Sequence, residues 1–209
     1  MKYLILDFNG TVLDDRQASL DALNCAISKY LDRKPVEMDE YLHIFTFPIS
    51  EYYKNAGFDF ENGGYTYEQA GQVWFDYYTS HKESYKIHKE IFKLIDEARL
   101  KNYRVVLLSA SQLTLLKEQL KELNIESYFD EVLGIDNIYA QSKMEIALGW
   151  SKGKDLSKSI FVGDSLHDLE CGQAMGVKNI YLTCKGHQAR DVLEKKWHSV
   201  IDEFSEVQL

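Results

Sequence analysis

The sequence predicts an α/β protein whose core is a mostly parallel sheet, with a helical segment inserted after the first strand. An apolar run of β-forming residues opens the chain at residues 2–6 and stops at a tight turn. From about residue 87, short apolar runs alternate with amphipathic stretches, which is the pattern of βαβ units and a parallel sheet. Between these two parts, residues 35–86 are rich in aromatic side chains and lack this alternation.

The opening run is predicted to be the buried central strand of the sheet, because residues 2–6 are apolar nearly throughout. Asp7 follows it directly, and Asn9-Gly10 then predicts a turn, since both residues tolerate positive φ. Ligand sites of open α/β sheets lie just beyond the carboxyl ends of the strands. Asp7 is therefore a candidate for chemistry, with the capping of a turn as its alternative role.

The inserted segment is predicted to be helical. The spacing of apolar residues indicates a helix over residues 14–31 and further helices over 51–56 and 67–82. Turns are expected at 46–48 and 62–64, which contain a proline and a glycine pair. Packing between these helices accounts for most of the aromatic rings of the segment.

The alternating part of the chain supplies the remaining strands and the helices that cover the sheet. Strands are predicted over residues 103–108, 131–134, 159–162 and 178–182. Helices are predicted over residues 89–100, 113–123, 143–150, 167–175 and 189–195. Parallel strands joined by helices end at the same edge of the sheet, so side chains at their carboxyl ends should meet there.

The composition restricts the classes of partner and the compartment. The 209 residues suffice for one full core and a small second domain. A net charge of −9 argues against nucleic acid as the main ligand, whereas a small phosphorylated ligand needs only a local cationic pocket. Three scattered cysteines, Cys25, Cys171 and Cys184, indicate free thiols in a reducing compartment. Without a charged leader or an apolar run of about 20 residues, we expect a cytoplasmic protein with no membrane partner. The sequence carries no signal for an oligomeric state.

Polar residues at the predicted strand ends form a set that suits phosphoryl transfer. Asp7, Ser109 and Asp164 each follow a strand, and Lys143 precedes a helix. Asp168 lies one helical turn after Asp164 and can point to the same place. Their carboxylate oxygens suit a hard cation such as Mg²⁺, and the lysine and hydroxyl can hold a phosphoryl group. Each residue alone also has an ordinary structural role, so the prediction depends on all of them together.

Four short motifs containing these residues occur in order along the chain. They are Asp7-Phe8-Asn9-Gly10-Thr11, Leu107-Leu108-Ser109-Ala110-Ser111, Gln141-Ser142-Lys143-Met144 and Gly163-Asp164-Ser165-Leu166-His167-Asp168. In these motifs the sequence resembles the haloacid dehalogenase-like (HAD) hydrolases, and within that superfamily the phosphoglycolate phosphatase-like group. The resemblance covers nearly the whole chain. It implies the HAD fold, with a Rossmann-like parallel sheet core domain of residues 1–14 and 87–209 and a helical cap domain of residues 15–86.

The resemblance also implies roles for individual residues and a small phosphorylated metabolite as substrate. Asp7 is expected to be the nucleophile that forms an aspartyl-phosphate, and Lys143 to neutralise charge beside it. The implied catalytic residues are Asp7, Asn9 and Lys143. The implied phosphate-binding residues are Gly10, Ser109, Ala110 and Lys143. The implied ligands of Mg²⁺ are Asp7, the backbone carbonyl of Asn9, Asp164 and, in a supporting role, Asp168.

Asn9 is a departure from the pattern of the family. Phosphatases of this family have an aspartate at this position, which protonates the leaving alcohol and later activates water. An amide has no proton to transfer, and the loss of a positioned acid–base group costs on the order of 10²–10⁴ in rate. The cost should be smaller for weakly basic leaving groups, such as those of aryl and acyl phosphates. Metal binding should survive, because the ligand at Asn9 is its backbone carbonyl.

Several interpretations of Asn9 therefore stay open. The chain can be a phosphatase of reduced power or narrow preference, or a non-catalytic or regulatory protein that binds phosphate esters. It can be a phosphonate hydrolase with Lys54 as the Schiff-base lysine, although a surface position is the simpler expectation for Lys54. A dehalogenase would not need the acidic metal pair. Asn9 can also have been introduced to trap substrate, or deamidation of Asn9-Gly10 can restore the family's carboxylate.

Overall fold

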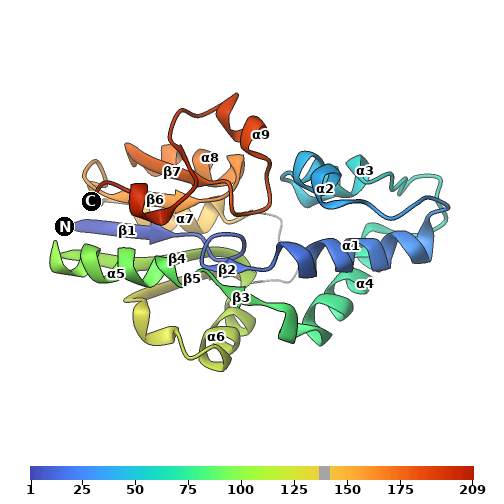
Figure 1. Ribbon diagram of the computed structural model, residues 1–209, viewed down its shortest axis with the longest axis horizontal. Coiled ribbons are helices and arrows are strands. Elements are labelled where there is room, and N and C mark those ends of the chain that lie inside the picture. Colours follow the sequence, from blue (N-terminus) through green and yellow to red (C-terminus); the bar gives the residue numbers. More distant parts are fainter. Residues whose placement is uncertain (137–141) are drawn as a thin grey trace.

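The core of the protein is a six-stranded sheet in which every neighbouring pair of strands is parallel. The computed structural model describes residues 1–136 and 142–209. The strand order is β5-β4-β1-β6-β7-β8, so β1 is central, as predicted (Figure 1). The strands are β1 (Lys2–Leu6), β4 (Tyr103–Gln112), β5 (Glu131–Ile135), β6 (Ile160–Gly163), β7 (Asn179–Thr183) and β8 (Val200–Ile201). The predicted α/β fold class is confirmed.

Helices cover both faces of the sheet, and alternate residues of each strand pack against one layer or the other (Figure 1). Leu4 and Leu6 face a layer that contains α5 and α6, whereas Ile5 faces a layer with α7, α8 and α9. These helices are α5 (Glu90–Leu100), α6 (Leu113–Glu122), α7 (Met144–Ser151), α8 (Leu166–Ala174) and α9 (Arg190–Glu194). Burial on both faces explains why β1 is apolar at every inner position.

The helical insertion lies beyond the carboxyl edge of the sheet, on the right of Figure 1. Its helices are α1 (Arg16–Tyr30), α2 (Met38–Ile44), α3 (Ile49–Asn55) and α4 (Tyr67–Ser80). They enclose a small core of their own, which includes the buried rings of Tyr41, Tyr52, Tyr53 and Phe58. A short antiparallel pair, β2 (Leu13–Asp14) and β3 (Lys86–Ile87), joins the insertion to the sheet domain at both crossings of the chain.

The second predicted strand differs from the observed one at its end. It was expected to end at Leu108, but β4 continues to Gln112 because β5 still runs beside it after a shift in register. Gly134 of β5 permits this close approach, since a Cβ there would lie 2.8 Å from the carbonyl oxygen of Ser111. Pairing with β1 ends at Leu107, so Ser109 still lies at the edge where Asp7 emerges.

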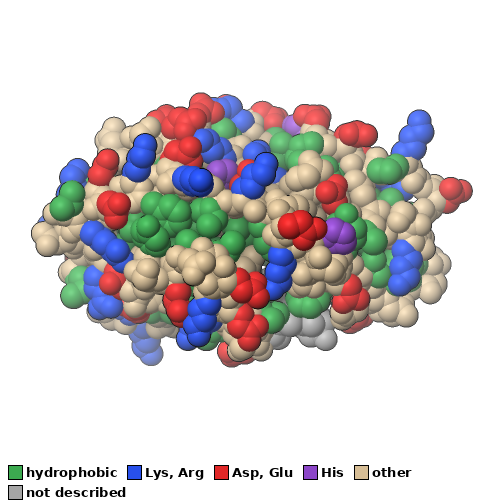
Figure 2. Space-filling view, turned by 60° about the horizontal axis from the view of Figure 1, so that its bottom comes forward, with side chains coloured by type: hydrophobic (Ala, Val, Ile, Leu, Met, Phe, Trp, Pro, Cys, Tyr) green, Lys and Arg blue, Asp and Glu red, His purple; other side chains and the backbone are tan. Residues whose placement is uncertain are grey.

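The sequence patterns missed the shortest elements. They did not predict α2, β2, β3 or β8, nor the 3₁₀ turns η1 (Lys82–Ser84), η2 (Glu126–Tyr128) and η3 (Phe204–Glu206). Elements of two to seven residues show too few periods for a hydrophobic pattern to stand out. No helix of the described residues is both long and apolar enough to cross a membrane. Figure 2 shows acidic and basic side chains interspersed on one face of the molecule.

Candidate active site

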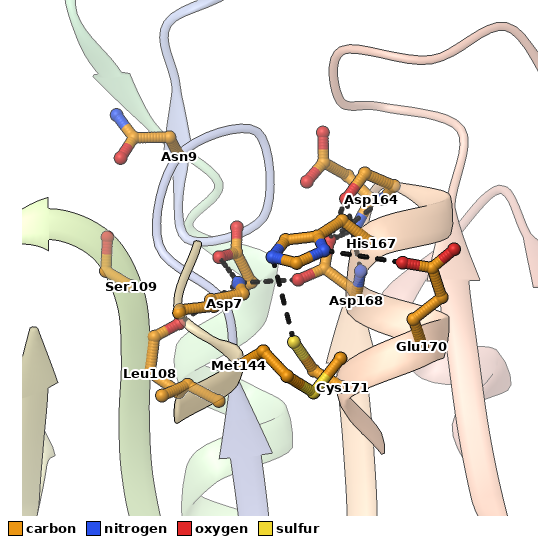
Figure 3. Close-up of polar contacts among 12 residues, drawn as sticks. Asp7, Asn9, Leu108, Ser109, Met144, Asp164, His167, Asp168, Glu170 and Cys171 are labelled. Atoms are coloured by element: carbon orange, nitrogen blue, oxygen red, sulfur yellow. Dashed lines mark hydrogen bonds and ion pairs between the residues drawn. The ribbon is translucent and has the colours of Figure 1, made fainter. Parts of the chain in front are cut away.

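The polar residues that were predicted from strand ends meet at the carboxyl edge of the sheet (Figure 3). Asp7 follows β1, Ser109 lies near the end of β4, and Asp164 follows β6. Asp168 projects from the first turn of α8, and Lys143 precedes α7. All five side chains are buried. The sheet therefore collects into one place residues that are far apart in the sequence.

The loops at this edge pack closely because glycines line the contacts. Gly10 adopts a φ of +77°, and a Cβ there would lie 2.3 Å from Oδ2 of Asp164. A Cβ at Gly186 would lie 2.1 Å from the Cβ of Asp164. The turn after β1 and the loop after β7 thus both press against Asp164, which only glycine allows. Ser165, not Asp164, caps α8, so the Asp164 carboxylate is not used as a cap.

Lys143 lies between two of the buried carboxylates. Its ammonium forms an ion pair with Oδ1 of Asp7 and another with Oδ1 of Asp168, at 2.6 Å for the latter. It also donates a hydrogen bond to the carbonyl oxygen of Leu108 at 3.3 Å. Burial disfavours the charged amine, but Asp168 and Asp7 outweigh burial and raise the pKa of Lys143. The lysine is therefore a fixed positive charge beside Asp7.

Three buried carboxylates, those of Asp7, Asp164 and Asp168, have oxygen atoms within 4.8 Å of one another. Burial raises the pKa of Asp7 well above its usual value even though Lys143 opposes the shift, and burial raises the pKa of Asp164 to about 7. One lysine does not balance three carboxylates in such an interior. A hard divalent cation would, and carboxylate oxygens are the ligands it prefers. The residues therefore fit a metal such as Mg²⁺.

Asp168 also organises the loop that carries Asp164. Its Oδ2 accepts hydrogen bonds from the backbone N–H groups of Asp164 and Ser165, at 3.1 and 2.9 Å, and from the Ser165 hydroxyl at 2.6 Å. Burial opposes ionisation of Asp168, but Lys143 and these donors outweigh it and lower its pKa. Asp168 thus positions both Lys143 and Asp164.

The side chain of Asn9 is fully engaged. Its Nδ2 donates to Oδ2 of Asp15 at 2.8 Å and to the Tyr78 hydroxyl at 2.9 Å, and its Oδ1 accepts from the Ser111 hydroxyl at 3.1 Å. The N–H of Gly10, which would attack the amide in a deamidation, donates to Asp15 and to the carbonyl of Leu13. The structure therefore holds this amide in place and opposes deamidation in the folded protein.

Asp15 and His187 belong to the site although the sequence prediction did not include them. Nε2 of His187 lies 3.1 Å from Oδ1 of Asp15, and both side chains are buried. Burial opposes both charges, but each partner outweighs it, so the pKa of Asp15 is lowered and that of His187 is raised to about 9. The N–H of His187 donates to Oδ2 of Asp164 at 2.6 Å. No local pattern marks the pair, because it joins residues 172 positions apart.

Two tyrosines of the insertion complete this network. The hydroxyl of Tyr78 in α4 donates to Oδ2 of Asp15 at 2.6 Å. The hydroxyl of Tyr41 in α2 forms a hydrogen bond with Nδ1 of His187 at 2.7 Å. The ion pair of Asp15 and His187 therefore connects two helices of the insertion to the turn that carries Asn9.

A cavity of about 290 Å³ opens above these residues. Asp7, Ser109, Ala110, Lys143 and Asp164 lie at its base, and aromatic residues of the insertion form much of its wall. Ser109 and Ala110, which were predicted to bind phosphate, therefore line this cavity together with Asp7 and Lys143. Gly10 is not among the described residues that line the cavity, because its N–H turns toward Asp15 and Leu13.

Lys54, the candidate Schiff-base lysine, lies away from this cavity. Its side chain is 57% exposed and forms an ion pair with Glu51 at 2.8 Å. Its pKa is raised by this hydrogen-bonded partner, whereas a lysine that forms a Schiff base needs a lowered pKa. Lys54 is therefore not placed to form a Schiff base with a substrate in this cavity. Its position gives no support to the phosphonate hydrolase interpretation.

The predicted family is found in a comparison with family profiles. The profile described as haloacid dehalogenase-like hydrolase matches residues 4–182. A search of curated proteins found no match.

Solved structures share the fold over nearly their whole length. A hydrolase of the haloacid dehalogenase-like family from Streptococcus pneumoniae has a TM-score of 0.77 at 15% identity, covering 99% of this chain and 96% of its own. A protein from Lactobacillus delbrueckii, provisionally assigned as a phosphoglycolate phosphatase, has a TM-score of 0.74 at 19% identity, with 96% and 94% covered. A provisionally assigned β-phosphoglucomutase from Thermotoga maritima has a TM-score of 0.65 at 17% identity, with 96% and 94% covered. At these identities the likeness shows the fold alone.

Proposed function

Because the chain belongs to the haloacid dehalogenase-like hydrolase family, we propose that it is a phosphatase that hydrolyses a small phosphorylated metabolite, with Mg²⁺ as its cofactor. The observation that carries the proposal is the buried cluster of Asp7, Asp164 and Asp168 around Lys143, at the base of the cavity. Burying such a cluster costs stability, since unbalanced carboxylates in an interior destabilise the fold. Clusters of this kind are typical of functional sites, which supports a chemical role here.

In the proposed reaction Asp7 is the nucleophile. One of its carboxylate oxygens attacks phosphorus, the bond from phosphorus to the leaving oxygen breaks, and an aspartyl-phosphate forms. Water then attacks the phosphorus of the aspartyl-phosphate, the bond from phosphorus to the Asp7 oxygen breaks, and the carboxylate is regenerated. Inorganic phosphate leaves, and the proton of the attacking water passes to the phosphate or to solvent. Lys143 lies against Asp7, so it favours the ionised nucleophile and balances the phosphoryl charge. The hydroxyl of Ser109 at the base of the cavity orients a phosphoryl oxygen.

A divalent metal would bind at the carboxylate cluster at the base of the cavity. Asp7, Asp164 and the backbone carbonyl of Asn9 would hold it, with Asp168 in support. Mg²⁺ would neutralise negative charge on the phosphoryl group, as it does in other phosphoryl transfers.

Residues 15–86 are proposed to act as the cap over a core of residues 1–14 and 87–209. Three contacts seat α2 on the loop after β7 and on the first turn of α9. The N–H of Ala189 donates to the carbonyl of Leu42 at 3.0 Å, and the Gln188 side chain donates to the carbonyl of Phe45 at 2.8 Å. His43 lies 3.0 Å from Asp191. With these contacts made, the cap covers the cavity and limits the entry of water.

The proposal is tested with p-nitrophenyl phosphate and acetyl phosphate in the presence of Mg²⁺. Wild type should hydrolyse both, and Asp7→Asn should lose roughly 10⁴-fold or more, since removal of a nucleophile has effects of this size. Equal activity of the two proteins would contradict the proposal. Absence of turnover together with Mg²⁺-dependent binding of phosphate esters would support the second candidate, a protein that only binds them. The observation that favours this candidate is the fully engaged amide of Asn9.

A further inference from the structure

We propose that the substrate of this site is an aryl phosphate, a phosphate monoester of a phenol with a single ring and no second anionic group. This inference rests on the proposed phosphatase function and adds the class of leaving group. The lining of the cavity, the pairing of its cations and the amide at position 9 each support it independently.

Aromatic rings begin directly beside the proposed phosphoryl site. The ring of Phe45 stacks on His187, with the two ring centres 5.0 Å apart. On another side, Tyr78 is hydrogen-bonded to Asn9 and stacks on Trp74, with ring centres 4.6 Å apart and planes within 14°. All five residues line the same cavity. The group attached to the phosphoryl oxygen therefore enters a space with aromatic walls, where a ring stacks favourably.

The cations of the cavity are already paired. Among the described residues that line it, the basic side chains are Lys82, Lys143 and His187. Lys82 lies 2.7 Å from Glu122, His187 pairs with Asp15, and Lys143 pairs with two aspartates at the base. Among these described residues, a carboxylate or second phosphate on the substrate would have to compete with Glu122 for Lys82 or with Asp15 for His187, and burying a charge without a partner is costly. Phosphorylated carboxylic acids and bisphosphates therefore fit this cavity poorly.

The size of the cavity suits one ring. Its volume of about 290 Å³ lies at the lower end of ligand sites, which begin near roughly 300 Å³. An apolar cavity of about 150 Å³ accommodates benzene. The space above Asp7 is therefore sufficient for a phosphoryl group and one aromatic ring.

The chemistry at position 9 agrees with this substrate class. When Asp7 attacks an aryl phosphate, the electrons of the broken P–O bond pass to a phenolate oxygen. A phenol has a pKa of about 10, so its anion leaves without a proton from the enzyme and takes one from water afterwards. Asn9 cannot donate that proton, and an alkoxide leaving group would need it. Among phosphate monoesters, aryl esters are therefore those whose hydrolysis depends least on the acid that Asn9 cannot supply.

A binding experiment tests the class without requiring turnover. Titration calorimetry with Mg²⁺ compares benzylphosphonate with methylphosphonate, cyclohexylmethylphosphonate and phosphonoacetate. We expect benzylphosphonate to bind at least about tenfold tighter than methylphosphonate, because a ring is removed from water. It should bind severalfold tighter than the cyclohexyl compound because of stacking. Equal affinities, or tighter binding of phosphonoacetate, would overturn the proposal.

A pair of variants in α4 tests the aromatic wall. Phe75 and Tyr77 are both half-buried, but only Phe75 lines the cavity. We expect Phe75→Leu to raise KM for phenyl phosphate about fivefold or more and to leave KM for acetyl phosphate unchanged, because only the former places a ring against the wall. Tyr77→Leu should behave as wild type with both substrates. If both variants raise KM equally, the aromatic wall does not contact the ring of the substrate. The same conclusion follows if Phe75→Leu raises KM equally for both substrates.

The outcomes separate this inference from the proposed function. If acetyl phosphate is hydrolysed in an Asp7-dependent way but ligands with an aromatic ring are not preferred, the phosphatase function is retained. The inference that the substrate is an aryl phosphate is then wrong. Tight binding of benzylphosphonate without hydrolysis of any ester removes the phosphatase function and keeps an aromatic phosphate as the ligand.

Discussion

At position 9 the decisive contact is that between Asn9 and Asp15. The amide nitrogen of Asn9 lies 2.8 Å from Oδ2 of Asp15, which is buried and also bound by His187. An aspartate at position 9 would place its carboxylate at this distance from that of the buried Asp15, and the two would have to share a proton. The family's acid at position 9 and a charged Asp15 are therefore incompatible neighbours. This coupling changes what a single reversion of Asn9 is expected to achieve.

We predict that Asn9→Asp alone gains little activity and that Asn9→Asp combined with Asp15→Asn gains much more. In the double variant the amide introduced at position 15 can donate to the carboxylate introduced at position 9, so the contact is kept with the two groups exchanged. A restored acid should then raise kcat/KM for alkyl phosphates by roughly 10²-fold or more. A double-mutant cycle on kcat/KM measures the coupling. If the single variant equals the double variant, the two positions are independent and the prediction is wrong.

We also predict a pH dependence of stability from His187. Asp15 outweighs burial and raises the pKa of His187 from 6.5 to about 9. The pair therefore stabilises the fold fully below pH 6.5, and its contribution disappears as the pH rises through 9. The shift corresponds to about 3 kcal/mol of unfolding free energy. Denaturant titrations from pH 6 to pH 10 should show this loss in wild type and not in His187→Gln.

An exposed histidine provides the control for that experiment. His198→Gln should keep the loss of stability between pH 6.5 and 9, because His198 is exposed and outside the site. If His187→Gln shows the same pH profile as wild type, the buried ion pair is not the cause.

Among the elements, α2 and the loop after β7 are joined through Gln188. Its side chain donates to the carbonyl of Phe45, at the end of α2, and accepts from the N–H of Leu166, at the start of α8, at 2.8 and 2.7 Å. Gln188 is buried, so its loss leaves two backbone groups without partners. One residue thus connects the insertion to the helix that carries Asp168.

We predict that Gln188→Ala loosens α2 without altering the chemistry at Asp7. Each of the two unsatisfied groups should destabilise the closed state by about 1–3 kcal/mol if it stays buried. The free energy needed to open α2 should therefore fall. Hydrogen exchange in residues 38–44 should become faster, and KM should rise more than kcat falls. Lys54→Ala, which removes an exposed ion pair in α3, should leave both measurements unchanged. Unchanged exchange in Gln188→Ala would show that the other contacts suffice.

At the scale of the whole molecule, the buried negative charge links stability to pH and metal. Burial raises the pKa of Asp164 to about 7 and that of Asp7 well above its usual value. A carboxyl group with a raised pKa in the folded state favours folding when protonated and loses that contribution as the pH rises. Metal-free protein should therefore lose stability from Asp164 between about pH 4 and pH 7, and Asp7 contributes in the same direction.

We predict that Mg²⁺ raises Tm more at pH 8 than at pH 6. At pH 8 the Asp164 carboxylate is mostly ionised and available to the cation, whereas at pH 6 protons compete for it. Thermal unfolding with 10-fold steps of Mg²⁺ concentration at the two pH values measures the difference. Asp164→Asn should abolish most of the Mg²⁺ effect, while Lys54→Ala should retain it. An equal rise of Tm at both pH values would contradict the proposed metal site.

Much of the fold and of the candidate site could be predicted from the amino-acid sequence. The buried run at β1 and the strand–helix alternation predicted the parallel sheet, because the type of an element is encoded in local periodicity. The sequence also predicted that three side chains lie close together, those of Asp7, Ser109 and Asp164, since the carboxyl ends of parallel strands lie at the same edge of a sheet. Elements of a few residues, such as α2 and β2, could not be predicted, because their form comes from what they pack against.

The amino-acid sequence by itself predicted that Asp7 lies beside a lysine and two further carboxylates, and its resemblance to the family indicated that Asn9 stands in place of an acid. Only the tertiary structure decided what surrounds that amide. Asp15 and His187 meet across 172 residues, and Tyr41 and Tyr78 reach them from separate helices of the insertion. The periodicity of the sequence does not predict such contacts. They depend on how the helices and strands pack together, whereas periodicity reflects only the local structure of one element. The same packing formed the aromatic cavity above Asp7, from which the class of substrate is inferred.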